Sequence, residues 1–88
     1  MGYSPYTLAI VPHGTDLSAV KPRITKALEA RNYGYPICCV HGTLNTVDLD
    51  LITMASLVVH FDDDGLGIIS KWRHGNPKRK TLRVKLTN

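Results

Sequence analysis

Short apolar runs along the chain predict three strands, at residues 6–11, 35–40 and 56–61. The second and third runs are apolar at nearly every position, which is typical of parallel strands covered on both faces. A fourth segment, 81–87, alternates apolar residues with polar or charged ones and is predicted to be a half-exposed edge strand. The pattern therefore predicts an α/β protein with a mainly parallel sheet.

Apolar residues at helical spacing predict a helix over 16–31, with Asp16 as its cap and Asn32 just after its end. Pro22 lies inside this segment, where a proline costs about 3 kcal/mol unless it occupies the first turn. We therefore expect the regular helix to begin near Lys21.

Two further segments are each compatible with two structures. Residues 44–55 combine helical spacing with an alternating stretch, so they form either a helix or a loop and a strand. Residues 65–75 form either a helix capped by Asp64, or a strand that follows a hairpin turn at Asp64 and Gly65. With helices in both places, the element order is β-α-β-α-β-α-β.

The length of 88 residues predicts one domain, spanning 1–88. The favoured architecture is a small three-layer, Rossmann-like α/β domain with a mostly parallel four-stranded sheet. If 44–55 is a loop and a strand, the alternative is a ferredoxin-like βαββαβ fold. A domain of this size has a small core, so a large substrate would lie across its surface or a partner protein would complete the site.

Charge is distributed unevenly along the chain. The formal net charge is +4, and opposite charges cancel over residues 1–60, so the whole excess lies in residues 61–88. A basic patch of this kind suits nucleic acid, either DNA or RNA, and a solvated basic face has the same composition. The candidate phosphate-binding residues are Lys71, Arg73, Lys78, Arg79 and Lys80.

Hydrophobic run length, the N-terminal residues and the cysteines indicate the cellular compartment. No apolar run reaches the roughly 18 residues that span a membrane, and the N-terminus lacks the basic and apolar regions of a signal peptide. Cys38 and Cys39 are adjacent, which places them poorly for a mutual disulfide, so we expect both to stay reduced. These features predict a cytoplasmic protein with no membrane partner.

An acidic cluster, Asp62, Asp63 and Asp64, follows the third predicted strand. The carboxyl ends of parallel strands lie along one edge of a sheet, so we expect this cluster to lie near His13 and His41. Asp62 and Asp64 would then hold Mg²⁺ together with waters and phosphate oxygens. The alternative is a solvent-exposed turn in which Asp64 caps a helix.

The same region resembles a Toprim domain, the small α/β module of bacterial-type primases, type IA topoisomerases and some nucleases. The apolar run 57–61 leads into Asp62, Asp64 and Gly67, which match the family's Asp-x-Asp-x-x-Gly signature between a strand and a helix. The resemblance implies a Mg²⁺-binding or Mn²⁺-binding module that interacts with nucleic acid. Asp62 and Asp64 would be its metal ligands, and phosphodiester chemistry its activity.

Two upstream segments extend the resemblance, and one of them departs from it. Residues 40–44 resemble the Gly-Thr segment of the primase-like arrangement, and residues 10–16 resemble the first signature. That signature normally presents a Glu, where this chain has Pro12 and His13. The catalytic set would then be His13, as a general base, with the two aspartates. A degenerate, non-catalytic Toprim module and a small non-enzymatic interaction protein with a basic binding face are the alternatives.

Overall fold

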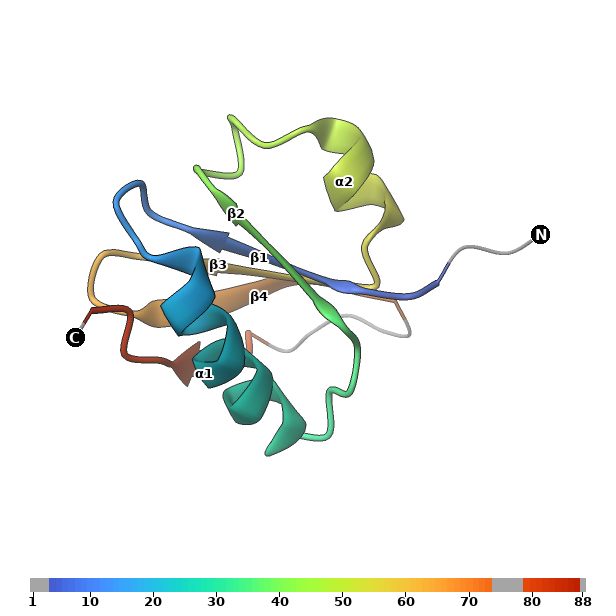
Figure 1. Ribbon diagram of the computed structural model, residues 1–88. Helices are drawn as coiled ribbons and strands as arrows, with labels where there is room; N and C mark the ends of the chain where they lie inside the picture. Colours follow the sequence, from blue (N-terminus) through green and yellow to red (C-terminus); the bar gives the residue numbers. More distant parts are fainter. Residues whose placement is uncertain (1–3, 74–78, 88) are drawn as a thin grey trace.

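The computed structural model describes residues 4–73 and 79–87. Within these residues the chain forms five strands and two helices, which confirms the α/β class (Figure 1). In chain order the elements are β1 (Thr7–Val11), α1 (Leu17–Glu29), β2 (Ile37–His41), α2 (Leu49–Met54), β3 (Leu57–Phe61), β4 (Leu66–Trp72) and β5 (Thr81–Arg83).

The five strands form one mixed sheet with the order β2-β1-β3-β4-β5. β1 pairs in parallel with β2 and with β3, whereas β4 runs antiparallel to β3 and to β5. The expected mostly parallel four-stranded sheet is therefore not found, because the sheet has a fifth strand and half of its strand pairs are antiparallel. The ferredoxin-like alternative is also wrong, because β1 has parallel neighbours on both sides.

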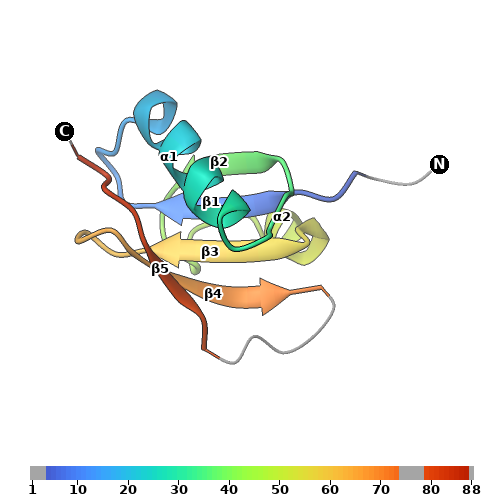
Figure 2. The same ribbon diagram turned by 90° about the horizontal axis from the view of Figure 1, so that it is seen from below.

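The two helices cover opposite faces of the sheet, so the expected three layers are present (Figures 1 and 2). α1 buries Val20, Ile24 and Leu28 against the larger apolar cluster, which contains residues from β1, β3, β4 and β5. A smaller cluster on the other face includes Leu8 and Ile10, with residues of α2 packed against it.

α1 begins at Leu17, so the expected start of the regular helix near Lys21 is wrong. The Asp16 side chain caps the helix as predicted, since its Oδ1 accepts a hydrogen bond of 3.1 Å from the Ser18 backbone N–H. Pro22 lies inside the helix on its exposed side. Its ring leaves the Ser18 carbonyl without a helical N–H partner, but Ser18 is itself exposed, so water can take that place.

The segment after the acidic cluster is the strand β4, joined to β3 by a tight hairpin turn. The Gly65 N–H donates to the Asp62 carbonyl at 3.1 Å, and the Asp62 N–H donates to the Leu66 carbonyl at 3.0 Å. Gly65 has a φ of 84°, which is the conformation that a type I turn with a glycine bulge requires. Gly67 then lies against Phe61, where an added Cβ would come 2.5 Å from the ring. The helix expected over 65–75 is therefore wrong, and the hairpin alternative is confirmed as far as residue 73.

The C-terminal segment packs beside α1 and against the hairpin (Figures 1 and 2). The predicted alternation is confirmed, because Leu82, Val84 and Leu86 are all buried in the larger cluster. The Val84 N–H donates to the Gly65 carbonyl at 2.9 Å. The strand itself is shorter than the expected 81–87, since β5 ends at Arg83.

Neither helix of the described residues is long and apolar enough to cross a membrane.

Candidate functional site

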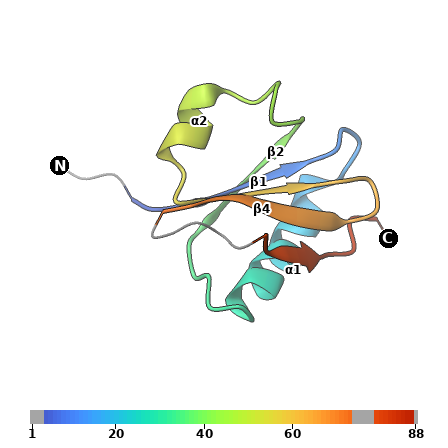
Figure 3. The same ribbon diagram turned by 180° about the vertical axis from the view of Figure 1, so that it is seen from behind.

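The acidic cluster lies at the end of β3, on the edge where the loop after β1 also lies (Figure 3). Oδ1 of Asp62 accepts two hydrogen bonds of 2.9 Å, from the backbone N–H groups of Asp64 and Leu66. This carboxylate therefore closes the hairpin turn, which is the usual role of Asp at such a position. Asp62, Asp63 and Asp64 are all exposed, and Asp63 occupies the tip of the turn.

The structure brings His13 and His41 together at the same edge of the sheet. Their rings are stacked, with centroids 6.0 Å apart, and both residues are exposed. His41 lies opposite Val11 in the register of β1 and β2, and its Nε2 is 2.6 Å from the Thr15 carbonyl oxygen. Among the described residues, no three His, Cys, Asp or Glu side chains form a group that could hold a metal ion. The Mg²⁺ site at Asp62 and Asp64 stays a prediction.

The structure places two of the basic residues predicted from the sequence, Lys71 and Lys80, at opposite faces of the sheet. Lys71 is half-buried, and its ammonium donates to the carbonyls of Ile52 and Thr53 at the C-terminal end of α2. Lys80 lies on the opposite side, with its Nζ 4.7 Å from the centroid of the Trp72 ring. Arg73 and Arg79 are exposed, and Lys78 lies outside the described residues.

A basic groove instead runs between α1 and the C-terminal segment, and we call it the α1–β5 groove. Its volume is about 360 Å³. It is lined by Arg23, Lys26, Ala27, Ala30, Arg83, Val84 and Lys85. The lining thus combines three apolar residues with four cationic ones. Within residues 4–73 and 79–87, no acidic residue lines the groove.

Two of the four cations of the groove are anchored to the backbone. Arg23 donates from Nη1 to the Lys85 carbonyl at 3.0 Å, and this bond spans the two walls. Arg83 donates from Nη1 to the Asp64 carbonyl at 3.2 Å. Within the described residues, the side chains of Lys26 and Lys85 make no hydrogen bond. These two ammonium groups are therefore available to an anion in the groove.

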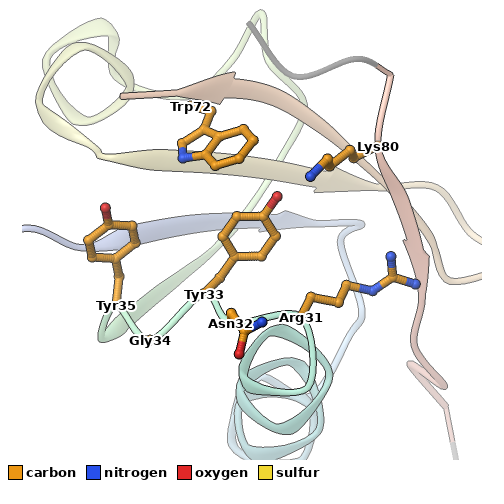
Figure 4. Close-up of a pocket in the computed structure, with 7 residues that line it drawn as sticks. All are labelled: Arg31, Asn32, Tyr33, Gly34, Tyr35, Trp72 and Lys80. Carbon is orange, nitrogen blue, oxygen red and sulfur yellow. The ribbon is translucent and has the colours of Figure 1, made fainter. Parts of the chain in front are cut away.

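A second hollow, which we call the aromatic pocket, lies beyond the C-terminal end of α1 (Figure 4). Its volume is about 540 Å³. It is lined by Arg31, Asn32, Tyr33, Gly34, Tyr35, Trp72 and Lys80. The pocket adjoins the α1–β5 groove, because Ala30 of the groove precedes Arg31 of the pocket, and Lys80 begins the segment that contains β5.

The end of α1 explains how the tyrosines reach this pocket. Asn32 has a φ of 66°, and the Tyr33 N–H donates to the Leu28 carbonyl at 2.9 Å. The Asn32 N–H donates to the Glu29 carbonyl at 3.0 Å, which completes a Schellman motif. This motif turns the chain back toward the sheet and directs Tyr33 onto Trp72. Their rings meet edge to face, with centroids 5.4 Å apart.

Sequence reasoning missed most of these residues. Arg23, Lys26 and Arg31 were cancelled by nearby acidic residues in the charge count, although helical spacing places the first two beside Ala27 and Ala30 on one side of α1. That combination of small and cationic residues on one helix face was the available signal. Nothing in the sequence indicates that this face lies against β5.

Comparisons of this chain with protein-family models, with curated proteins and with solved structures give no match.

Proposed function

We propose that this protein is a small nucleic-acid-binding module that holds a phosphate backbone in the α1–β5 groove. The observation that carries the proposal is the convergence of basic side chains from two distant parts of the sequence on one continuous surface. The six residues of this surface are Arg23, Lys26, Arg31, Lys80, Arg83 and Lys85.

The charge of this surface suits a chain of phosphates better than a single anion. The cations follow α1 and the segment 80–85 side by side, so they form a track and not a closed cage. Phosphate contacts from Lys and Arg supply sequence-independent affinity through the release of condensed counterions. The neighbouring aromatic pocket favours nucleic acid over other polyanions, because bases stack on aromatic side chains.

The acidic turn is not part of this proposal. The Asp62 carboxylate has a structural explanation in the hydrogen bonds that close the hairpin. The Toprim signature places a helix after its aspartates, whereas this chain continues as β4. Metal-dependent phosphodiester chemistry at Asp62 and Asp64, with His13 as a base, stays a prediction of the resemblance.

The test is fluorescence anisotropy with a labelled single-stranded oligonucleotide of about 12 nucleotides, as DNA and as RNA. We expect binding at low salt that weakens as salt rises. Four to six phosphate contacts give a slope of log K against log salt of about −3 to −4. The double substitution Lys26→Ala with Lys85→Ala should make this slope shallower by about 1.4, since each lost contact contributes about 0.7.

Lys21→Ala is the matched control. Lys21 is an exposed cation of the same helix, but it lies beside Cys38 and Cys39 and outside the α1–β5 groove. The control should leave the slope unchanged. Absence of binding at low salt would contradict the proposal, and so would a change of slope per substituted lysine that is as large in Lys21→Ala as in the double variant.

A further inference from the structure

The aromatic pocket contains a buried polar atom that no described residue satisfies. Tyr33 is only 6% exposed, and its hydroxyl is buried without a hydrogen-bond partner. Figure 4 shows this hydroxyl directed toward the space between Trp72 and Lys80. A buried polar group without a partner destabilises the protein, and a ligand that hydrogen-bonds to the group removes this penalty.

The other side chains of the pocket supply two further kinds of contact. Tyr35 and Trp72 are both half-buried, so part of each side chain is exposed in the pocket. Lys80 places its ammonium 4.7 Å from the Trp72 ring centroid and 5.8 Å from that of Tyr33. Arg31 is exposed at the rim, on the side of the α1–β5 groove. Planar rings, one hydroxyl and two cations together match a nucleobase with its phosphates.

We propose that the aromatic pocket receives one unpaired base of a strand whose backbone lies in the α1–β5 groove. Tyr35 and Trp72 stack on the base, the Tyr33 hydroxyl hydrogen-bonds to it, and Arg31 and Lys80 hold the flanking phosphates. This inference rests on the proposed function and adds a preference for single strands. The volume of about 540 Å³ is in the range of sites for small ligands.

The preference follows from the cost of extracting a base. A base inside a duplex is stacked on both sides and paired, and taking it out costs a few kcal/mol. A single strand presents bases that are already partly exposed. The phosphate groove accepts either form, so the aromatic pocket is the part of the molecule that distinguishes them.

The first experiment uses the intrinsic fluorescence of Trp72, which is the single tryptophan of the chain. Three probes are titrated and compared at equal total phosphate concentration: a single-stranded oligonucleotide, the same oligonucleotide with abasic sites throughout, and the corresponding duplex. We expect quenching of Trp72 with the single strand alone. The abasic strand should still bind in the groove, as anisotropy reports, but about tenfold more weakly and without quenching.

The outcomes separate the two proposals. If all three probes bind with equal affinity and leave Trp72 emission unchanged, the pocket proposal is overturned and the groove proposal stands. If none of them binds, both proposals are overturned. Quenching that is equal for the abasic and the complete strand would show that phosphates alone reach the pocket, and this result also overturns base recognition.

The second experiment compares two tyrosine hydroxyls. Tyr33→Phe removes the unpartnered hydroxyl, so the free protein should be as stable as the parent or more stable, while affinity for the single strand falls about fivefold. Tyr6→Phe is the matched control. The Tyr6 hydroxyl donates to the Leu51 carbonyl at 2.7 Å on the other face of the sheet, so its loss should reduce stability and leave affinity unchanged.

Tyr35→Ala completes the test, because its half-buried ring can be removed with less risk to folding than the buried ring of Tyr33. Its affinity for the single strand should fall about tenfold, and its affinity for the abasic strand should not change. Parent-like affinity for the single strand in both Tyr33→Phe and Tyr35→Ala would overturn the proposal.

Discussion

Replacing Gly65 with alanine should destabilise the protein far more than the same replacement at Gly14. Both glycines have a positive φ, 84° at Gly65 and 90° at Gly14. An alanine held in this region costs roughly 1–2 kcal/mol at either position. The two sites differ in their surroundings. An added Cβ at Gly14 meets nothing within 4 Å, whereas at Gly65 it would clash with the backbone carbonyl of Val84.

The clash has a cost because the Val84 carbonyl belongs to the backbone and has no alternative rotamer. Relief would require the segment after β5 to move away, with loss of the 2.9 Å hydrogen bond from the Val84 N–H to the Gly65 carbonyl. Such a bond contributes about 1 kcal/mol. Val84 and Leu86, which are 5% and 7% exposed, would also lose part of their packing. We therefore expect a total loss of about 3–5 kcal/mol for Gly65→Ala, which is a large part of the stability of a small domain.

Urea denaturation monitored by Trp72 fluorescence and by circular dichroism measures both variants. Gly14→Ala should lose about 1–2 kcal/mol and keep its m-value. Gly65→Ala should lose at least about 2 kcal/mol more, or fail to fold cooperatively. Equal losses in the two variants would refute the close packing of the C-terminal segment against the hairpin. They would also remove the structural basis of the α1–β5 groove, because that segment forms one of its walls.

Three further substitutions test individual contacts. Asp62→Ala, measured in EDTA, should lower the free energy of unfolding by about 1–2 kcal/mol, because the carboxylate accepts hydrogen bonds from two N–H groups of the turn. Asp63→Ala should change the free energy of unfolding by less than about 0.5 kcal/mol. Equal effects of the two substitutions would contradict the role of Asp62 in closing the turn. Lys71→Met should lower stability by about 1 kcal/mol through its lost bonds to α2, while oligonucleotide affinity by anisotropy stays unchanged. Weaker binding of this variant would show that Lys71 contacts nucleic acid. Asn32→Ala should cost about 1 kcal/mol in thermal unfolding because of its positive φ, whereas Asn32→Gly should be neutral or stabilising.

The parts of the fold that depend on local pattern were predictable from the sequence. The apolar runs gave β1, β2 and β3 to within two residues at each end, because β1 and β3 are central and buried on both faces and the edge strand β2 is apolar over most of its length. The cap at Asp16 and the end of α1 shortly before Asn32 were also predictable. Asp16 accepts a backbone hydrogen bond at the start of the helix, and Asn32 adopts the positive φ that follows its end. Alternation of apolar and polar residues identified the buried side of the C-terminal segment, because neighbouring side chains of an extended chain point to opposite faces.

The hairpin after β3 shows where local pattern was not decisive. Leu66, Ile69 and Trp72 satisfy helical spacing as well as they satisfy a strand, and a bulge in the pairing of β3 with β4 disturbs strict alternation. The structure is decided by tertiary contacts: Gly67 packs on the Phe61 ring, and Gly65 packs on the segment that contains Val84. Val84 is distant from Gly65 in the sequence, and the spacing of Phe61 and Gly67 does not by itself indicate a contact.

The candidate site was harder to predict than the fold. The Asp-x-Asp spacing that resembles the Toprim signature is also the spacing with which an Asp closes a hairpin turn. The α1–β5 groove combines Lys26 with Lys85, which are far apart in the chain and share no motif. A charge count along the sequence located the excess in the last third but could not show that α1 and the turn after it contribute half of the six basic residues of the proposed surface.

The most direct test of the central claim is chemical-shift mapping by NMR with a single-stranded oligonucleotide, at low salt and without added metal. The account predicts that shifted amides lie along the C-terminal half of α1 and the turn after it, residues 23–35, and along 80–85, with the Trp72 side-chain N–H also shifted. Shifts centred instead on 12–15, 41–43 and 62–65 would place the site at the carboxyl edge of the sheet and contradict the account. An unchanged spectrum would exclude nucleic acid as the partner.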